Sequence, residues 1–398
     1  MKINNLVLAG ALSLGLASIA NAQNRVYLTG STAFRPALYN ALAACFDASP
    51  AVQIAAYKCS TVGTIDPHTA GQMEFKGNIG GAAYIIKCAW SGSEAGISDV
   101  AKNSTETFID DIGVNGVQAI NSTSAASATD SHAVDLAMAD TSQAVSKTQT
   151  PALTGIEVGI IPFIWIKNAQ GHPYHAGTYP DYDRIVNVTH PQLRVALTGG
   201  TLAALITGNA SDTNHYVYVS GRDNNSGTRV NTFCDTGYGV FKLPQQIIIT
   251  GSDGAPTIQN GATTTSGQSS GGTLATTMTY SGSATAADPI NGGTGWYAIA
   301  YVGMYDADVA LASGGDAVAL TLNGVAESPA AVEQGQYSFW GNEHIYQNVN
   351  GLSSAANTVY NSLTTGGKIS GAVDGTHEIS LSAMQATKTT DLSDPTHN

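Results

Sequence analysis

Residues 222–228, with the sequence Arg-Asp-Asn-Asn-Ser-Gly-Thr, carry groups suited to hold a small oxyanion. They follow an alternating Tyr-Val-Tyr-Val run, which predicts a strand, and precede residues that can open a helix. The first N–H groups of a helix lack internal partners and favour negative charge. Ser226 and Thr228 can donate from their hydroxyls, Gly227 allows close approach, and Arg222 adds a forked cation. An ordinary strand-to-helix connection with a serine or threonine N-cap is the alternative.

Two other stretches repeat this arrangement of a strand, a small polar turn and a helix start. The first turn is residues 30–33 (Gly-Ser-Thr-Ala), and Pro36 fits the first turn of the helix that follows it. The second turn, residues 91–96, follows strand-like residues 83–86. Three separated copies are much less frequent by chance than one, so we expect these loops to act together.

Length and composition limit the classes of protein to which the chain can belong. The 398 residues predict two domains, and 43% hydrophobic content supports a sizeable core. Only 11% of residues are charged, and the net charge is −13 without a basic run interleaved with aromatics, so nucleic-acid binding is not expected. Residues 251–294 are rich in Gly, Ser and Thr and predict a surface loop or hairpin, in which 274–280 is the only strand-like stretch.

The N-terminus predicts export. Residues 1–22 have the pattern of a secretory signal peptide, with Lys2 in the basic region, an apolar stretch, and Ala20-Asn21-Ala22 as the cleavage site. A retained anchor helix is the alternative reading. Because Gln23 and not cysteine follows the site, lipid attachment there is not expected. The mature protein is therefore expected to be periplasmic or secreted, after cleavage near Ala22.

The four cysteines predict disulfides in an oxidising compartment. Up to two bridges are expected, with three possible pairings that the sequence leaves open. The spacing fits no CxxC metal site, so no metal is expected. The residues concerned are Cys45, Cys59, Cys88 and Cys234.

Strands that alternate with helices predict an α/β fold with two lobes. Residues 156–166 form a long apolar, β-branched run that suits a buried strand crossing between lobes, and residues 295–302 suit the return strand. Ligands in such folds lie at the carboxyl ends of strands. An aromatic cluster near the C-terminus is expected in the core; its members are Tyr337, Phe339, Trp340 and Tyr346.

In this order the motifs resemble the periplasmic phosphate-binding proteins of ABC transporters, which belong to the type II periplasmic binding protein superfamily. The resemblance covers most of the chain. The matching segments are Gly30-Ser31-Thr32, Gly92-Ser93-Glu94-Ala95-Gly96, the acidic loop at 134–140, the Arg222 to Thr228 loop, and the return strand at 297–302.

The resemblance implies a fold and a ligand. The fold is two-lobed, with two mixed sheets flanked by helices and joined by a two-strand hinge. Lobe I would comprise 23–154 and 303–398, and lobe II 155–302. The ligand would be inorganic phosphate, with arsenate as a competitor and an ABC transporter permease as partner, in a monomeric protein that is not an enzyme and needs no cofactor. The ligand-binding residues would be Thr32, Ala33, Ser93, Asp140, Arg222, Ser226, Gly227 and Thr228.

Asp140 has a physical rationale beside the family comparison. It follows a predicted buried strand, where an aspartate often caps a helix, here one starting at Thr141. A carboxylate beside a dianion is repulsive unless the anion donates a hydrogen. Phosphate carries one at neutral pH and sulfate does not. An unpaired buried acceptor costs several kcal/mol, which would exclude sulfate by a factor of about a thousand.

The chain departs from the family pattern at several positions. Ala139 removes a possible donor, Glu94 adds a negative charge near the pocket, and Asn224 and Asn225 replace an Asp-Gly pair. Asp223 beside Arg222 could restore an orienting carboxylate. These departures leave a second hypothesis, a ligand-free structural or cell-surface protein of the same fold. A phosphatase is a third hypothesis, but no activating base or metal cluster is evident.

Overall fold

The structure of the chain is a computed structural model. It describes residues 23–59, 65–168, 180–261, 266–280, 288, 291, 295–312 and 317–398. The signal peptide expected at 1–22 and parts of the insertion expected at 251–294 lie outside the described residues. Within the described ranges, no helix has the length and hydropathy needed to cross a bilayer.

Strands dominate the described part of the chain. They are β1 (Asn24–Gly30), β2 (Gln53–Tyr57), β3 (Gln72–Ile79), β4 (Ala82–Ala89), β5 (Thr105–Ile109), β6 (Thr129–Ala133), β7 (Leu136–Ala139), β8 (Gly155–Lys167), β9 (Asn187–Val188), β10 (Thr201–Leu202), β11 (Tyr216–Ser220), β12 (Gln246–Ser252), β13 (Ala255–Gly261), β14 (Trp296–Gly303), β15 (Val318–Ala319), β16 (Thr321–Leu322), β17 (Trp340–Gln347), β18 (Ala386–Thr387) and β19 (Thr396–His397).

The helices are mostly short and lie between strands. They are α1 (Arg35–Ala43), α2 (Ser93–Lys102), α3 (Pro180–Arg184), α4 (His190–Ala196), α5 (Ala203–Thr207), α6 (Gly227–Thr236), α7 (Gly271–Met278), α8 (Met304–Leu311), α9 (Pro329–Glu333) and α10 (Ser354–Leu363), with 3-10 turns η1 (Pro67–Thr69), η2 (Gln143–Val145) and η3 (Leu381–Ala383).

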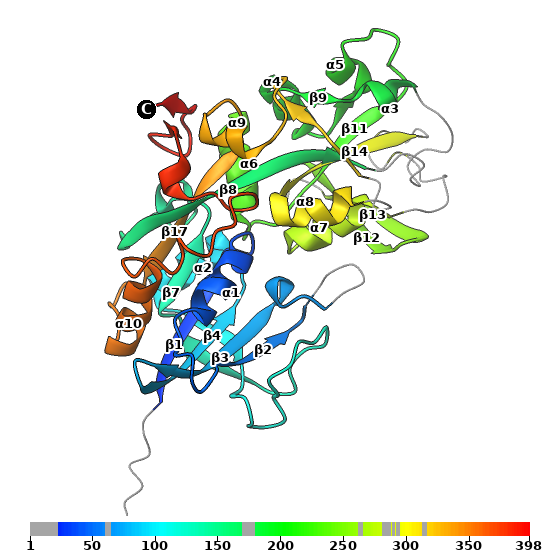
Figure 1. Cartoon of the computed structure of the whole chain (residues 1–398). Coiled ribbons are helices and arrows are strands. Elements are labelled where there is room, and N and C mark those ends of the chain that lie inside the picture. The colour runs from blue at the N-terminus through cyan, green and yellow to red at the C-terminus, as the bar shows by residue number, and fades with distance from the viewer. Residues whose placement is uncertain are drawn as a thin grey trace, which may run out of the picture.

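Most of the strands form one mixed sheet, which is continuous from one part of the molecule to the other through β8 (Figure 1). Its main path runs β13-β12-β11-β14-β8-β17-β7-β1-β4-β3-β2. The pairs β5-β6, β9-β16 and β18-β19 form separate two-stranded sheets. β8 pairs with β17 along its first part and with β14 along its last part, both antiparallel. The expected α/β fold, with mixed sheets flanked by helices, is confirmed, and the two expected sheets are continuous through β8.

β8 can span both parts because it is buried over most of its length. Its residues 159–167 are almost all buried, as the apolar, β-branched sequence predicts. Trp165 contacts Tyr301 of β14 edge-on and lies near Phe339. The aromatic cluster expected near the C-terminus is buried as well, and Tyr337 donates a hydrogen bond of 3.0 Å to the Phe163 carbonyl.

The prediction of a strand within the insertion is wrong. The stretch at 274–280 lies mostly in helix α7, whose N-cap Ser270 accepts a 3.0 Å hydrogen bond from the Thr273 amide. Leu274 and Met278 lie one turn apart and pack into the core, so burial selects the helix. The expected hairpin is formed instead by β12 and β13.

The structure contradicts the expected disulfides. All four cysteines are free and buried. Cys45, Cys59 and Cys88 lie within the main hydrophobic core, where the first two donate to backbone carbonyls of their own segments. Cys234 lies in a different apolar cluster, on α6. Cysteine is a small apolar residue in such cores, and its packing here explains its presence without a bridge.

The division into lobes stays a proposal. β8 is shared by both parts of the sheet, so the chain passes between them along this strand. The strand β16 pairs with β9, and α8 packs on α7, β8 and β14. This packing favours a return to the first part just ahead of β17, later than the boundary at 303.

Candidate functional site

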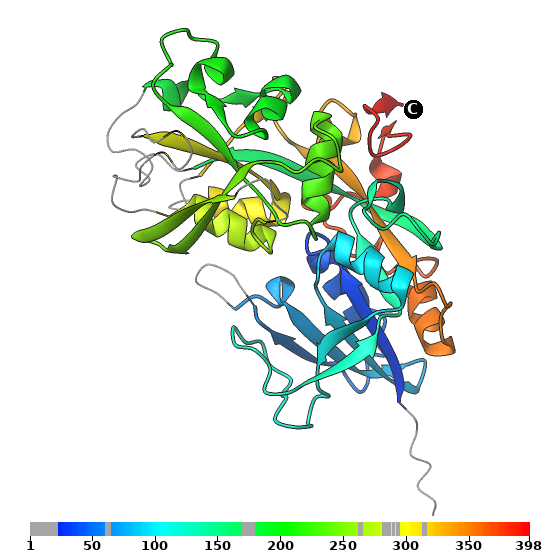
Figure 2. The ribbon, with the colours of Figure 1, turned by 180° about the vertical axis from the view of Figure 1, so that it is seen from behind.

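Strand-to-helix connections from both parts of the sheet meet at one place. β1 leads to α1, β4 to α2 and β11 to α6, and β7 ends beside β1. Because β1, β4 and β7 run parallel, their carboxyl ends lie at the same edge. In Figure 2 the N-terminal end of α6 comes down onto the N-terminal end of α2. The expected loops are therefore brought together.

Ser93, Asp140 and Gly227 are in direct contact. The Ser93 hydroxyl donates a 2.7 Å hydrogen bond to Oδ1 of Asp140, and the Asp140 amide lies 3.3 Å from Ser93 Oγ. A Cβ on Gly227 would stand 1.5 Å from Asp140 Oδ1 and 2.7 Å from Ser93 Oγ. Only glycine therefore permits the first turn of α6 to approach the other two loops so closely.

The start of α6 has the cap that its sequence predicts. The Ser226 hydroxyl accepts from the Arg229 amide at 3.3 Å. The Thr228 side chain is buried beside it. Asn231, one turn further, donates 2.7 Å to the Asp140 carbonyl and fixes this helix to the acidic loop. The N-cap alternative is thus correct for Ser226, and it coexists with the convergence of the loops.

The turn before α2 is held to the α6 loop through its backbone. The Glu94 amide donates 3.0 Å to the Asn225 carbonyl. Gly92 lies so close to Asn225 that a Cβ would meet its carbonyl oxygen at 2.4 Å. Lys147 reaches the same loop, with Nζ 2.8 Å from the Asn224 carbonyl and 3.0 Å from Asn225 Oδ1. The asparagines thus provide contacts between loops.

The Glu94 side chain is held beside the cluster by a backbone amide, and its charge adds to the effect of burial in raising the pKa of Asp140. It is buried, and its Oε2 accepts 2.9 Å from the Lys147 amide. Burial raises the pKa of this carboxyl, against the effect of that hydrogen bond. The departure from the family pattern at Glu94 is therefore accommodated on the side of α2 that faces residues 146–147.

Arg222 is buried and anchored by backbone carbonyls. Its Nε donates to the Gln268 carbonyl and its Nη2 to the Ser269 carbonyl, both at 3.1 Å. Its own amide donates 3.1 Å to the Tyr301 hydroxyl. The third nitrogen, Nη1, faces the region of Asp306. A Cβ on Gly271 would lie 3.3 Å from this nitrogen and 1.8 Å from Asp306 Oδ2. The guanidinium is held as a fixed cation beside the converging loops.

Thr32 and Ala33 line a small cavity next to these contacts. Its other walls include Arg35, Tyr305 and Asp306. The cavity volume is ≈ 10 Å³, which is room for about one water molecule. An anion of the size of phosphate would fit only if the loops separate, because Asp140 and Ser93 also contact Gly227 directly. Of the eight expected residues, Thr32 and Ala33 line this cavity, whereas Ser93, Asp140 and Gly227 are in contact with one another.

Burial and neighbouring charges set the protonation state of Asp140. Burial raises the pKa of Asp140 to about 6, and the Ser93 hydrogen bond and the Arg222 charge oppose that rise. Asp140 is therefore mostly ionised at neutral pH and protonated in mild acid. Desolvation also raises the pKa of Asp306, although Arg222 and Arg35 both stabilise its charge.

Three charged residues near the cluster were missed from the sequence. Arg35 opens α1 and donates from Nε to the His68 carbonyl at 2.7 Å. Asp306 lies in the first turn of α8, and Glu343 is fully buried on β17. Arg35 and Asp306 each follow a strand-to-helix junction closely, which is a usable signal. The sequence signal for Glu343 was weaker: it is an acidic residue within the C-terminal aromatic stretch that was expected to lie in the core.

No group of three or more potential ligands is placed to hold a metal ion within the described ranges. The donors of the cluster are hydroxyls, amides and one guanidinium, which suit an anion. A carboxyl beside them can accept a hydrogen from a partly protonated guest, or donate one itself when protonated.

The comparisons with known proteins give a distant likeness. No family model matches, and no curated protein matches the sequence. One similar solved structure, from Clostridium perfringens, is described as a phosphate ABC transporter substrate-binding protein with bound phosphate; it is 14% identical, with 90% of this chain and 100% of that chain covered and a TM-score of 0.48. Another is an ABC-type phosphate transport receptor from Vibrio cholerae. It is 12% identical, with 85% of this chain and 93% of that chain covered and a TM-score of 0.41. Such likeness says nothing of what this chain binds.

Proposed function

We propose that the chain is an exported solute-binding protein that captures inorganic phosphate between the two parts of its sheet. The observation that carries the proposal is the meeting of Ser93, Asp140 and the α6 N-terminus, with Arg222 fixed beside them. Helix-start amides, hydroxyls and a guanidinium are donors, and Asp140 is the one acceptor that selects a hydrogen-bearing anion.

The ligand set is the one expected from the sequence. Thr32 and Ala33 would bind from the α1 side, Ser93 from α2, and Ser226, Gly227 and Thr228 from α6. Because these residues are nearly in contact, capture would begin from a more open arrangement and end in closure around the anion, with β8 as part of the hinge. The protein would act as a monomer with an ABC transporter permease, without catalysis or cofactor, outside the cytoplasm. Arsenate would compete.

Isothermal titration calorimetry on protein stripped of ligand by unfolding and refolding tests this function. At pH 8, phosphate should give heat with a micromolar or tighter Kd, and sulfate should give none. The matched variant Asp140→Asn keeps the shape of the side chain and adds an amide donor, so it should bind sulfate as well. Absence of phosphate heat with the stripped wild-type protein would refute the proposal.

A second candidate is a ligand-free structural or cell-surface protein with the same fold. The direct packing of Gly227 on Asp140 and a cavity of only ≈ 10 Å³ favour it, because the interior is filled without a guest. In that case Arg222→Ala would leave the response to phosphate unchanged, since there would be none. If phosphate raises the Tm of the wild-type protein and not of Arg222→Ala, this candidate is excluded.

A further inference from the structure

Glu343 is a fully buried acid without an ordinary hydrogen-bond partner. Its side chain is 0% exposed. Neither Oε1 nor Oε2 accepts or donates a hydrogen bond within the described part of the chain. A buried carboxyl in this state is costly, so such a group usually serves a ligand, a water or a proton equilibrium.

The position of Glu343 connects it to the candidate site. β17 pairs with β7, where His344 faces Ala139, the residue before Asp140. The pairing of β17 with β8 shifts between Glu343 and His344, and such irregularities redirect side chains near functional sites. Two residues earlier, a Cβ on Gly341 would lie 2.5 Å from the Asp140 carbonyl. Glu343 therefore lies directly behind the acidic loop.

The groups around Glu343 are acidic or neutral. Asp140 follows β7, Glu378 lies in the segment that pairs with β8, and the Ser31 hydroxyl follows β1. Burial raises the pKa of Glu343 well above its ordinary value; the Asp140 and Glu378 charges add to the rise, and Ser31 opposes it. The Arg222 charge acts on Asp140 and opposes the rise of its pKa.

The two acids near the site therefore have different states. Asp140 ionises first, because it has a serine donor and a guanidinium beside it. Its charge then keeps the proton on Glu343, as in pairs of interacting carboxyls. A carboxylic acid kept neutral by its surroundings can also donate from its O–H, which an ionised carboxylate cannot.

We propose, on the basis of the phosphate-binding function above, that Glu343 is a specificity-determining positioning residue. It stands behind Ser31 and Asp140 as a neutral acid, so that the site presents one negative charge and not two to the entering anion. The Ser31 hydroxyl, which accepts from the Phe34 amide at 3.4 Å, is the neutral polar group on this side of Glu343. Anion binding then requires that Glu343 keep its proton.

The first measurement is the protonation state. Infrared difference spectra at pH 8 compare the wild-type protein with Glu343→Gln, which keeps the shape and remains neutral. A protonated-carboxyl C=O band should be present in the wild-type protein and absent from the variant. The control is Glu378→Gln, which removes a neighbouring buried acid and should leave that band in place. A wild-type spectrum with no band assignable to Glu343 overturns the proposal.

The second measurement is the phosphate affinity as a function of pH. As the pH rises above 8, the wild-type affinity should fall once Glu343 loses its proton, approaching a tenfold loss per pH unit. The phosphate affinity of Glu343→Gln should stay constant over the same range. The affinity of Glu378→Gln should fall as in the wild type but from a lower pH, because the Glu378 charge raises the pKa of Glu343. Coincident curves for wild type and Glu343→Gln overturn the proposal.

The outcomes separate the inference from the proposed function. A Glu343 band without any phosphate binding would refute the phosphate function and leave the neutral acid as a structural fact. Phosphate binding without the band would refute the inference alone. Should Glu343→Gln fail to fold, calorimetry of the wild-type protein in two buffers of different ionisation enthalpy replaces it: at the pH where the phosphate affinity falls, binding should take up a proton, and zero uptake there contradicts the inference.

Discussion

Two clusters of buried charge lie near the two ends of β1, and they differ in how their charges are satisfied. The sheet network consists of Arg25, Glu74, Lys87 and Asp111. The cleft cluster consists of Ser93, Asp140, Arg222 and Glu343. Arg25 lies near the start of β1, whereas Ser31 follows its end and adjoins the cleft cluster.

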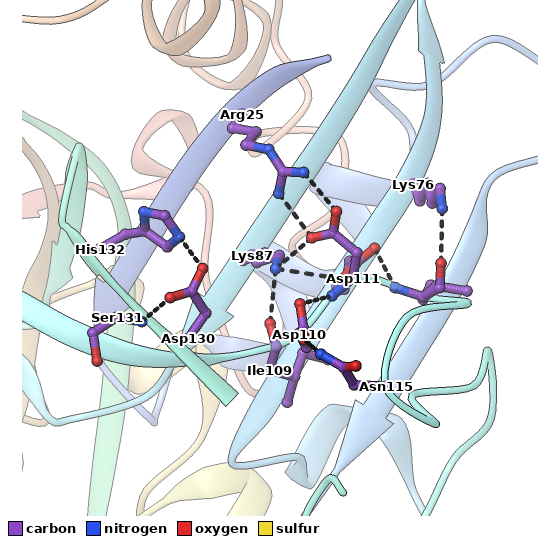
Figure 3. A network of polar contacts seen from close by, with 12 residues as sticks. Arg25, Lys76, Lys87, Ile109, Asp110, Asp111, Asn115, Asp130, Ser131 and His132 are labelled. Atoms are coloured by element: carbon purple, nitrogen blue, oxygen red, sulfur yellow. Dashed lines mark hydrogen bonds and ion pairs between the residues drawn. The ribbon is translucent and has the colours of Figure 1, made fainter. Parts of the chain in front are cut away.

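In the sheet network, charges of opposite sign lie against each other (Figure 3). Arg25 binds both oxygens of Asp111 through its two terminal nitrogens, at 2.7 and 2.5 Å. Lys87, only 1% exposed, lies 2.7 Å from Asp111 Oδ1 and 2.8 Å from the Ile109 carbonyl. These contacts, the Arg25 hydrogen bond first, hold the pKa of Asp111 below its ordinary value. Glu74 is the exception in the sheet network, because it lies 3.9 Å from Lys87 and burial raises its pKa to about 7.

The cleft cluster has no ion pair among the described residues. Burial raises the pKa of Asp140 to about 6, and neither oxygen of Glu343 has a partner within the described residues. Arg222 is held by backbone carbonyls and not by a carboxylate at ion-pair distance in the described part of the chain. In the proposed function, the sheet network stabilises the fold and the cleft cluster binds the anion.

The largest expected effect is that of Gly227→Ala on binding. The new Cβ would clash with Asp140 Oδ1, so α6 could not close onto the acidic loop. Phosphate affinity should fall about a thousandfold, about 4 kcal/mol, as measured by calorimetry. Gly371→Ala is the control, because Gly371 is exposed and its Cβ would meet only backbone oxygens of its own turn, at 3.3 Å or more; it should bind like the wild type. Equal affinities for the two variants would show that closure at Gly227 is not required.

Asp111→Ala should affect stability and not binding. It leaves Lys87 buried without its nearest charge, which costs about 3 kcal/mol, measured as a loss in the free energy of unfolding in urea. Phosphate affinity should change less than about twofold. Because the folded pKa of Asp111 is lowered, its stabilisation is present above its ordinary pKa and is lost as the pH falls. A loss of binding without a loss of stability would reverse the assignment of the two clusters.

Sulfate binding should depend on pH through Asp140. The pKa of this acid is raised to about 6, so its protonated form, which can donate to sulfate, predominates below that value. Sulfate affinity should be greatest in mild acid and fall about tenfold per pH unit above about pH 6. Calorimetry in a series of buffers measures this, with Asp140→Asn as a control that should not vary. A flat wild-type profile would mean that Asp140 does not face the anion.

Lys147→Ala should have the smallest effect. Its Nζ joins the acidic loop to the α6 loop through two hydrogen bonds, but this side chain is partly exposed. The loss should be about 0.5 kcal/mol, seen as a roughly twofold weaker phosphate affinity. A loss above tenfold would make Lys147 part of the anion site and not an outer contact between loops.

The sequence predicted the loops well because each rests on local rules. The strand, small polar turn and helix start are visible at Gly30, Gly92 and Gly227, and the apolar run at 156–166 lies within β8. The predictions from sequence were wrong where tertiary packing decides the structure. Cysteines in a core look the same as cysteines in bridges.

Contacts between distant segments were the other part that the sequence could not supply. Glu343 joins the cleft cluster only because β17 pairs with β7, about 200 residues earlier in the chain. Asp306 and Arg35 approach the same cavity from different elements. The filled interior, in which Asp140 contacts Gly227, is also a property of packing.

The most direct test is a crystal structure of the wild-type protein grown with arsenate, whose arsenic scatters anomalously. The account predicts one strong anomalous peak between Ser93, Asp140 and the Gly227 amide, within hydrogen-bond distance of all three and close to Arg222. A structure at saturating arsenate with no peak there, or with its peak elsewhere in the molecule, would contradict it.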